Sequence, residues 1–178
     1  MKTHIAPLAP ERIADPELRA LLVRCAQLGV PDAAFAGILA RAPQQARAVL
    51  RALLHSHTEG GVDHRLKEII RIRLARIAGD HCAAQLRSTQ ATRLGLDERH
   101  IEAGAGAHED DALLSPAERC ALRYARLLYL DPSRVDAAFY TELKTHFSEA
   151  QVMELGAFIA LHYGMLVFAR TLRAATPP

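Results

Sequence analysis

The sequence predicts an all-α protein, a helical bundle of about eight or nine helices built as a single domain over residues 1–178. Ala, Leu, Arg and Glu dominate and runs of β-branched residues are rare, a composition that favours helix. Half of the 178 residues are apolar, enough to bury a sizeable core. Capping residues followed by helically spaced apolar residues recur along the chain, a pattern typical of packed helices with short loops.

Three helices are expected before the first clear break. Asp15 and Pro16 form an N-cap and a first-turn proline, and Gly29 is the expected C-cap. The helices are expected at residues 16–29, 31–42 and 43–58. The break at residues 59–61 contains two glycines.

The fourth predicted helix begins at an Asp63 cap and is interrupted at Gly79-Asp80. Apolar residues cover much of its circumference, so we expect it to lie at the centre of the bundle. A fifth helix is expected from His81 or Cys82 to Gly95, and Asp97 caps a short sixth.

The second half holds two capping boxes. Ser115 with Glu118 begins a helix that continues to about Leu130, and Ser148 with Gln151 begins the last helix, which is expected to reach about Ala174. Another helix is expected over residues 135–146. The small, acidic segment 104–111 is the best candidate for a mobile loop. The apolar run 155–169, interrupted by His162, is too short to span a bilayer, which favours a buried core helix.

Charge and cysteine usage limit the classes of partner. Lys and Arg number 22 and Asp and Glu 20, a balance that argues against nucleic acid as a partner. The three cysteines are far apart and odd in number, which indicates free thiols in a reducing compartment. Residues 1–10 lack the layout of a signal peptide. We therefore expect a cytoplasmic protein with no membrane partner.

Glu68 is the first candidate catalytic residue. It lies among isoleucines and leucines on the central helix, where an unpartnered carboxylate would have a raised pKa suited to acid–base catalysis. Arg71 lies one turn further along and is close enough to pair with it. A purely structural pair of Glu68 with Arg71 or His64 is the alternative.

His81 and Cys82 follow the helix break and are the other candidate catalytic residues. A helix N-terminus lowers the pKa of a thiol, and His81 adjoins Cys82. The alternative is that Cys82 is a small buried apolar residue, as we expect for Cys25 and Cys120. His162 on the last helix is either a hydrogen-bonded core residue or a ligand-binding one. No metal-ligand spacing and no phosphate-binding loop is present, so no cofactor is expected.

Several segments together resemble the carboxymuconolactone decarboxylase and alkylhydroperoxidase D-like family. The resemblance spans about residues 33–172. It rests on the order and spacing of LKEIIRIRLARIAG at 66–79, SPAER at 115–119, ALRYA at 121–125, FSEAQVMEL at 147–155 and IALHYGM at 159–165.

The resemblance implies an all-α bundle that assembles as a homo-oligomer. It also implies a peroxiredoxin-like, antioxidant activity in members that carry a glutamate, then Cys-x-x-Cys, then a histidine. Glu68 matches the glutamate, but Asp80 and Ala83 occupy the cysteine positions and Arg87 the histidine position. Decarboxylase members lack the cysteine pair and carry out cofactor-free acid–base chemistry on a small lactone acid.

Three functions therefore stay open at this point. The first is a peroxidase in which Cys82 is the reactive thiol, His81 activates it and Glu68 relays protons. The second is acid–base catalysis on a small carboxylate or lactone, with Glu68 or His81 as base and Arg71 or Arg87, with His162, binding the substrate. The third is a non-catalytic, oligomeric binding module. The first two predict a small-molecule substrate.

Overall fold

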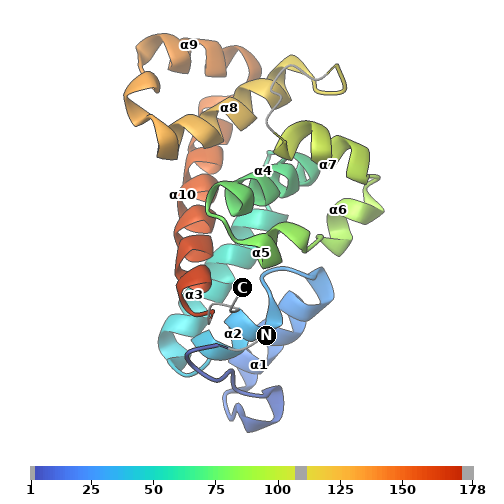
Figure 1. Ribbon diagram of the computed structural model, residues 1–178, viewed down its shortest axis with the longest axis vertical. Coiled ribbons are helices and arrows are strands. Elements are labelled where there is room, and N and C mark those ends of the chain that lie inside the picture. Colours follow the sequence, from blue (N-terminus) through green and yellow to red (C-terminus); the bar gives the residue numbers. More distant parts are fainter. Residues whose placement is uncertain (1–2, 107–111, 174–178) are drawn as a thin grey trace, which may run out of the picture.

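The structure, a computed structural model, describes residues 3–106 and 112–173. It confirms the all-α prediction, because the only β-pairing in these ranges is an isolated bridge between Thr3 and Arg173. The long helix α10 (Glu149–Thr171) runs along one side of the molecule, and α4 (His64–Ile77) packs against it at the centre (Figure 1). The other helices surround this pair.

The N-terminal helices begin where the sequence predicts. Asp15 accepts hydrogen bonds from the backbone N–H groups of Glu17 and Leu18, and Gly29 ends the first helix with a φ of 83° that favours glycine. The second helix is shorter than expected and ends at Leu39 rather than Ala42. The elements are a 3₁₀ turn η1 (Pro10–Arg12), α1 (Pro16–Leu28), α2 (Ala33–Leu39) and α3 (Pro43–Thr58).

The central position of α4 is confirmed, and it forces several charged side chains inside the protein. Every residue of this helix from 66 to 75 is buried. Lys67 pairs with Glu154 of α10, and Arg73 donates to the backbone oxygen of Gly104 at 3.0 Å. Buried charges are tolerated when they are paired and hydrogen-bonded, so these contacts fix α4 against its neighbours.

The predicted helix from residue 81 to Gly95 is wrong, because two short helices take its place. These are α5 (His81–Gln85) and α6 (Thr89–Arg93). The guanidinium of Arg71 binds the backbone oxygen of Leu86 at 2.7 Å, and Glu68 accepts the N–H of Ser88 at 2.7 Å. The side chain of Ser88 then caps α6. In a continuous helix the backbone oxygen of Leu86 and the N–H of Ser88 would form hydrogen bonds within that helix. Here they bind side chains of α4 instead.

The C-terminal half follows the predicted caps. Both capping boxes, at Ser115 and Ser148, are present. The expected mobile loop 104–111 begins inside a helix, and its residues 107–111 lie outside the described ranges, as does the predicted helix end at Ala174. The remaining elements are α7 (Glu98–Ala105), α8 (Pro116–Leu130), the 3₁₀ turn η2 (Pro132–Arg134) and α9 (Ala137–His146).

α10 begins at the predicted cap, Ser148. Its 23 residues continue through His162, which interrupts the apolar run and is buried. By length and composition alone α10 could cross a membrane, and 33% of its most apolar 18-residue window is buried. Met153 and Phe168 are among its exposed apolar side chains.

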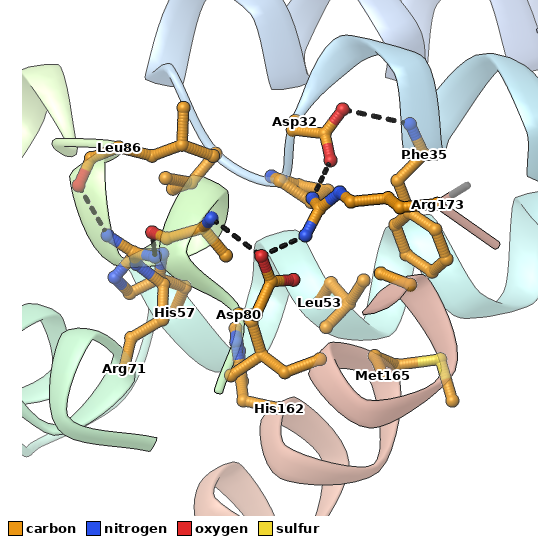
Figure 2. Close-up of a pocket in the computed structure, with 15 residues that line it drawn as sticks. Asp32, Phe35, Leu53, His57, Arg71, Asp80, Leu86, His162, Met165 and Arg173 are labelled. Atoms are coloured by element: carbon orange, nitrogen blue, oxygen red, sulfur yellow. Dashed lines mark hydrogen bonds and ion pairs between the residues drawn. The ribbon is translucent and has the colours of Figure 1, made fainter. Parts of the chain in front are cut away.

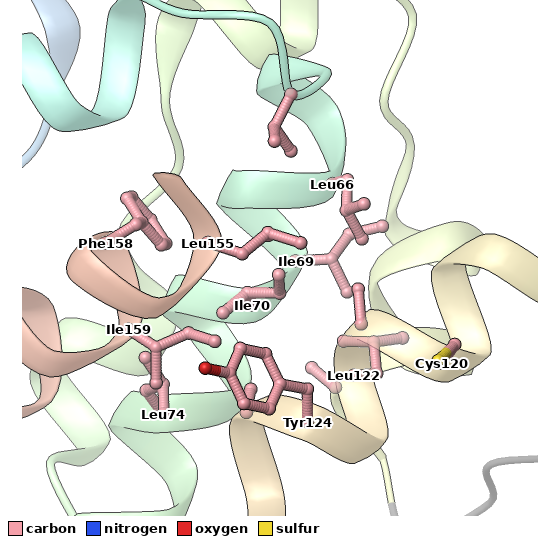
Figure 3. Packing of buried hydrophobic residues seen from close by; sticks show 14 of the residues in the cluster. Leu66, Ile69, Ile70, Leu74, Cys120, Leu122, Tyr124, Leu155, Phe158 and Ile159 are labelled. Atoms are coloured by element: carbon pink, nitrogen blue, oxygen red, sulfur yellow. The ribbon is translucent and has the colours of Figure 1, made fainter. Parts of the chain in front are cut away.

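The main core lies where α4, α8 and α10 meet, as Figure 3 shows. Ile69 and Ile70 of α4 pack there with Leu122 of α8 and Leu155 of α10. α7 approaches so closely that a Cβ atom on Gly104 would lie 2.3 Å from Cγ2 of Ile69. The absence of a side chain at Gly104 therefore sets the distance between α7 and α4.

Two helical glycines test this close packing. Gly104→Ala should lower the free energy of unfolding by about 1–3 kcal/mol, since the buried Ile69 has to shift. Gly164→Ala should raise it by about 0.5–1 kcal/mol, because nothing lies within 4 Å of a Cβ there. Urea denaturation measures both. Equal effects of the two substitutions would show that α7 and α4 are not closely packed.

Candidate functional site

A small pocket lies where α3, α4, α5 and α10 meet the segment that begins α2. Its volume is about 40 Å³, room for about three water molecules. Figure 2 shows the side chains around it. The polar lining residues are Asp32, His57, Arg71, Asp80, His162 and Arg173, and the apolar ones include Phe35, Leu53, Ala83 and Met165.

A buried ion pair forms the inner wall. Nε and one Nη of Arg71 each donate to a different carboxylate oxygen of Glu68, both at 2.8 Å. Arg71 also donates to the backbone oxygens of Ala83, at 2.9 Å, and Leu86. Glu68 is fully buried and Arg71 almost so. The geometry is the bidentate, charge-assisted arrangement that holds both groups firmly.

Burial alone would raise the pKa of Glu68, since it disfavours a charged carboxylate. The ion pair with Arg71 and the contact with His57 outweigh burial and hold this pKa well below its ordinary value. Glu68 is therefore ionised at neutral pH. The raised pKa that an unpartnered buried glutamate would have is not found, and the structural Glu68–Arg71 pair is present.

His57 of α3 packs against this pair. Its Nε2 lies 3.1 Å from Oε2 of Glu68, but the two are not aligned as a hydrogen bond, so Nε2 has no hydrogen-bond partner among the described residues. Burial lowers the pKa of His57 to about 4, although Glu68 opposes the shift. His57 is thus a neutral imidazole at pH 7.

Two more histidines surround His57. His162 of α10 has its ring centroid 5.5 Å from that of His57, and its Nε2 lies 3.2 Å from Oγ of Ser56. Complete burial lowers the pKa of His162 well below its ordinary value. His64 stacks on His57, and because its Nδ1 lies 2.7 Å from the backbone oxygen of His57, Nδ1 carries a proton. Its Nε2 contacts Ser88.

Asp80 faces the histidines across the pocket. It is 2% exposed, and its Oδ1 accepts from the backbone N–H of Ala83, at 3.0 Å, and from Arg173. Arg173 also pairs with Asp32 at 2.6 Å. Oδ2 of Asp80 has no hydrogen-bond partner among the described residues. Buried polar atoms are nearly always paired, so an unpaired carboxylate oxygen in a pocket marks a place for a ligand.

The predicted site residues fall into two groups. Glu68, Arg71 and His162 come together: Arg71 and His162 line the pocket, and Glu68 lies directly behind them. His81 and Cys82 are exposed on α5 and do not line it. Cys82 is therefore not a buried apolar residue, whereas Cys25 and Cys120 are buried as expected.

Arg87, the remaining predicted substrate-binding residue, lies outside the pocket lining. Its guanidinium pairs with Glu98 of α7, with Nε of Arg87 2.6 Å from Oε1 of Glu98. The hydrogen bond raises the pKa of Arg87. In this structure its charge is directed to a surface carboxylate.

Four polar residues of the pocket were not predicted as functional: Asp32, His57, Asp80 and Arg173. His57 shares the apolar face of its helix with Leu50, Leu53 and Leu54, a spacing that could have revealed its burial. Asp80 occupies the first cysteine position of the family that the sequence resembles, and this position could have indicated that Asp80 belongs to the site. Arg173 follows the last helix, and no local pattern indicates its long-range pairing. No group of three metal-binding side chains occurs among the residues that the structure describes.

The fold is shared with a debrominase and with a protein of unknown function. The debrominase Bmp8 superposes with a TM-score of 0.76 at 24% identity, covering 96% of this chain and 91% of that one. A Cys→Ala variant of Bmp8 in complex with 2,3,4-tribromopyrrole superposes with a TM-score of 0.77 at 23% identity. The match covers 98% of this chain and 94% of the variant. A protein of unknown function from Agrobacterium tumefaciens, described as a candidate AhpD antioxidant defence protein, gives 0.67 at 18% identity, with coverage of 79% and 95%.

This chain has the AhpD-like fold. The structural likeness confirms the fold that the sequence resemblance implied. No protein-family model and no curated protein matches the chain. At these identities the AhpD-like fold establishes the architecture and leaves the activity to be argued from the pocket.

The buried pair predicts a large loss of stability when it is broken. Arg71→Met should lower the free energy of unfolding by about 3–5 kcal/mol at pH 7, because it leaves the Glu68 carboxylate buried and unpaired. Arg65→Met is the matched control on the same helix, since Arg65 pairs with Asp63 at the surface and should cost at most about 1 kcal/mol. Urea denaturation compares them, and similar losses would contradict the role of the pair.

The buried histidines predict a dependence of stability on pH. Burial lowers the pKa of His57 to about 4 in the folded protein and that of His162 well below its ordinary value, so just below pH 6.5 only the unfolded chain binds their protons. Stability should therefore fall as pH drops below 6.5, with a slope that approaches about 1.4 kcal/mol per pH unit for each histidine. Urea denaturation at pH 5–6.5 should give a shallower slope for His162→Gln. An unchanged slope would mean that His162 is not a buried neutral group.

Proposed function

We propose that this protein is a cofactor-free enzyme that carries out acid–base chemistry on a small molecule, with Asp80 as the proton acceptor. The observation that carries the proposal is the unpaired Oδ2 of Asp80, which is buried in the wall of the pocket. Oδ1 is anchored by Arg173 and by the N–H of Ala83. One oxygen thus fixes the side chain, while the other has no partner among the described residues and would receive the substrate proton once a substrate displaces the side chains that cover it.

The neutral histidines supply the second proton-transfer group. His57 and His162 both line the pocket, and burial lowers the pKa of each, so both are uncharged imidazoles at pH 7. A neutral imidazole can donate or accept a proton. Asp80 would take a proton from the substrate, one of these rings would give a proton to the product, and transfer of the proton from Asp80 to that ring would restore both groups.

Thiol chemistry has weaker support in this pocket. The resemblance places the two cysteines of peroxidase members at Asp80 and Ala83, and both positions line the pocket here. The pocket therefore occupies the place where such a site is expected, but with a carboxylate and a methyl group in place of thiols. Cys82 is exposed and lies outside the lining.

A non-catalytic binding module is the second candidate. It predicts that Glu68, His81 and Cys82 do not converge on one pocket, which is the arrangement observed. The unpaired oxygen of Asp80 favours an enzyme over a module, although such an atom also suits simple binding.

Turnover of a panel of small neutral amides, lactones and ketones, with keto acids as the charged comparison, followed by NMR in D₂O, tests the proposal. The parent protein should consume a substrate or exchange its acidic C–H for deuterium, and Asp80→Asn should lower that rate by about 10²-fold or more. Cys82→Ser should keep the parent rate. The matched carboxylate control is Glu149→Gln, because Glu149 is highly exposed at the start of α10.

Two results would contradict the proposal. Consumption of hydroperoxide with a thiol reductant that disappears in Cys82→Ser would establish a peroxidase instead. Binding of panel compounds in the pocket with neither conversion nor exchange would establish a binding module.

A further inference from the structure

Both arginines of the pocket have their charge taken up inside the chain. Arg71 directs four of its five N–H groups to Glu68 and to the backbone oxygens of Ala83 and Leu86. Arg173 pairs with Asp80 and Asp32. An arginine that binds a substrate carboxylate needs its planar fork to be available. The fork of Arg71 is filled, and both terminal nitrogens of Arg173 are already bound to carboxylates.

The charges at and directly behind the pocket leave an excess of one negative charge. Arg71 and Arg173 stand against the three carboxylates of Glu68, Asp80 and Asp32. His57 and His162 carry no charge at pH 7, because burial lowers the pKa of each. Since a low-dielectric environment strengthens charge repulsion, an anion entering the pocket is disfavoured.

The unpaired acceptor of the pocket, Oδ2 of Asp80, favours a ligand that donates a hydrogen bond. Oδ2 of Asp80 can only accept while the carboxylate is ionised, and it has no partner among the described residues. Nε2 of His57 also has no hydrogen bond to a described residue, but it lies 3.1 Å from Oε2 of Glu68, so Asp80 supplies the acceptor for a ligand. The rest of the wall is largely apolar, with Leu53, Met165 and Ala169 among its residues.

The pocket volume limits the size of a ligand. An apolar cavity that takes benzene measures about 150 Å³, whereas this pocket measures about 40 Å³. A ligand of three or four non-hydrogen atoms is of the right order, and a larger one requires the surrounding side chains to move.

From this arrangement we infer that the pocket binds a small, neutral molecule that donates a hydrogen bond to Asp80, and that it discriminates against carboxylates. The inference rests on the proposed function, because it concerns the substrate of the same site. In this inference Arg71 holds the pocket wall and does not bind the substrate. Of the two substrates that the sequence suggested, a small carboxylate or a lactone, the carboxylate is excluded.

Matched pairs of probes test the charge preference. Formamide and formate share one shape, as do acetamide and acetate, and each pair differs in charge and in hydrogen-bond donors. Titration of the protein with each probe at pH 7, followed by NMR of the His57 and His162 rings and the Met165 methyl group, gives the dissociation constants. The two amides should bind at least tenfold more tightly than the two carboxylates.

Asp80→Asn tests the cause of that preference. The substitution removes one negative charge and supplies an amide donor, so the ratio of amide to carboxylate affinity should fall at least tenfold. Glu149→Gln removes an equal charge from an exposed position outside the pocket lining and should leave the ratio unchanged. An NMR spectrum of each variant verifies that it is folded, and the parent titrations stand alone if Asp80→Asn is not.

The possible outcomes separate the two proposals. Tighter binding of the carboxylates, or no effect of any probe on the pocket signals at 100 mM, would overturn the inference. Neither result bears on the proposed acid–base catalysis, which the turnover of Asp80→Asn tests separately. A loss of turnover in that variant without an amide preference in the parent would thus retain the proposed function and reject the ligand class.

Discussion

The ion pair between Glu68 and Arg71 organises the centre of this protein. It is buried on the central helix, where a lone charge would be strongly destabilising. Its remaining hydrogen-bonding groups reach the backbone of the segment after α4, at Ala83, Leu86 and Ser88. These bonds divide what would be one helix into α5 and α6 and hold the intervening chain against α4. The position of Asp80 in the pocket follows, because Asp80 begins that segment.

The pocket illustrates how one architecture supports different chemistry. The fold of this chain brings the segment after α4, the start of α5 and α10 together around the pocket. In this chain those places are occupied by Asp80, Ala83 and His162. Proton transfer needs a fixed carboxylate beside neutral imidazoles, whereas thiol chemistry needs sulfur at the same points. The residues in the pocket, rather than the fold, carry the functional argument.

Local patterns in the sequence predicted most of the fold. Caps such as Asp15, Ser115 and Ser148 act through hydrogen bonds within a few residues, so their signal lies in neighbouring sequence. The apolar coverage of α4 likewise indicated its central place.

The division of residues 81–95 was missed because it depends on Glu68 and Arg71, which lie well before the break. The pairing of Arg173 with Asp32 joins residues 141 positions apart and has no local signature. The candidate site divides in the same way: Glu68 and Arg71 form a local pair that the sequence indicated, whereas Asp80 and His57 come to the pocket only through tertiary packing.

The unpaired oxygen of Asp80 also has a consequence for how this protein can evolve. A buried acceptor without a partner lowers the stability of the empty protein by about 1–3 kcal/mol. Selection for heat resistance alone would therefore favour a neighbouring change that gives Oδ2 a partner and keeps the bonds of Oδ1 to Arg173 and to Ala83. Retention of the unpaired oxygen in a lineage would then record a demand other than stability, the trade-off between robustness and activity that reactive sites commonly show. Thermostable descendants that keep this acid should have gained their stability elsewhere in the bundle.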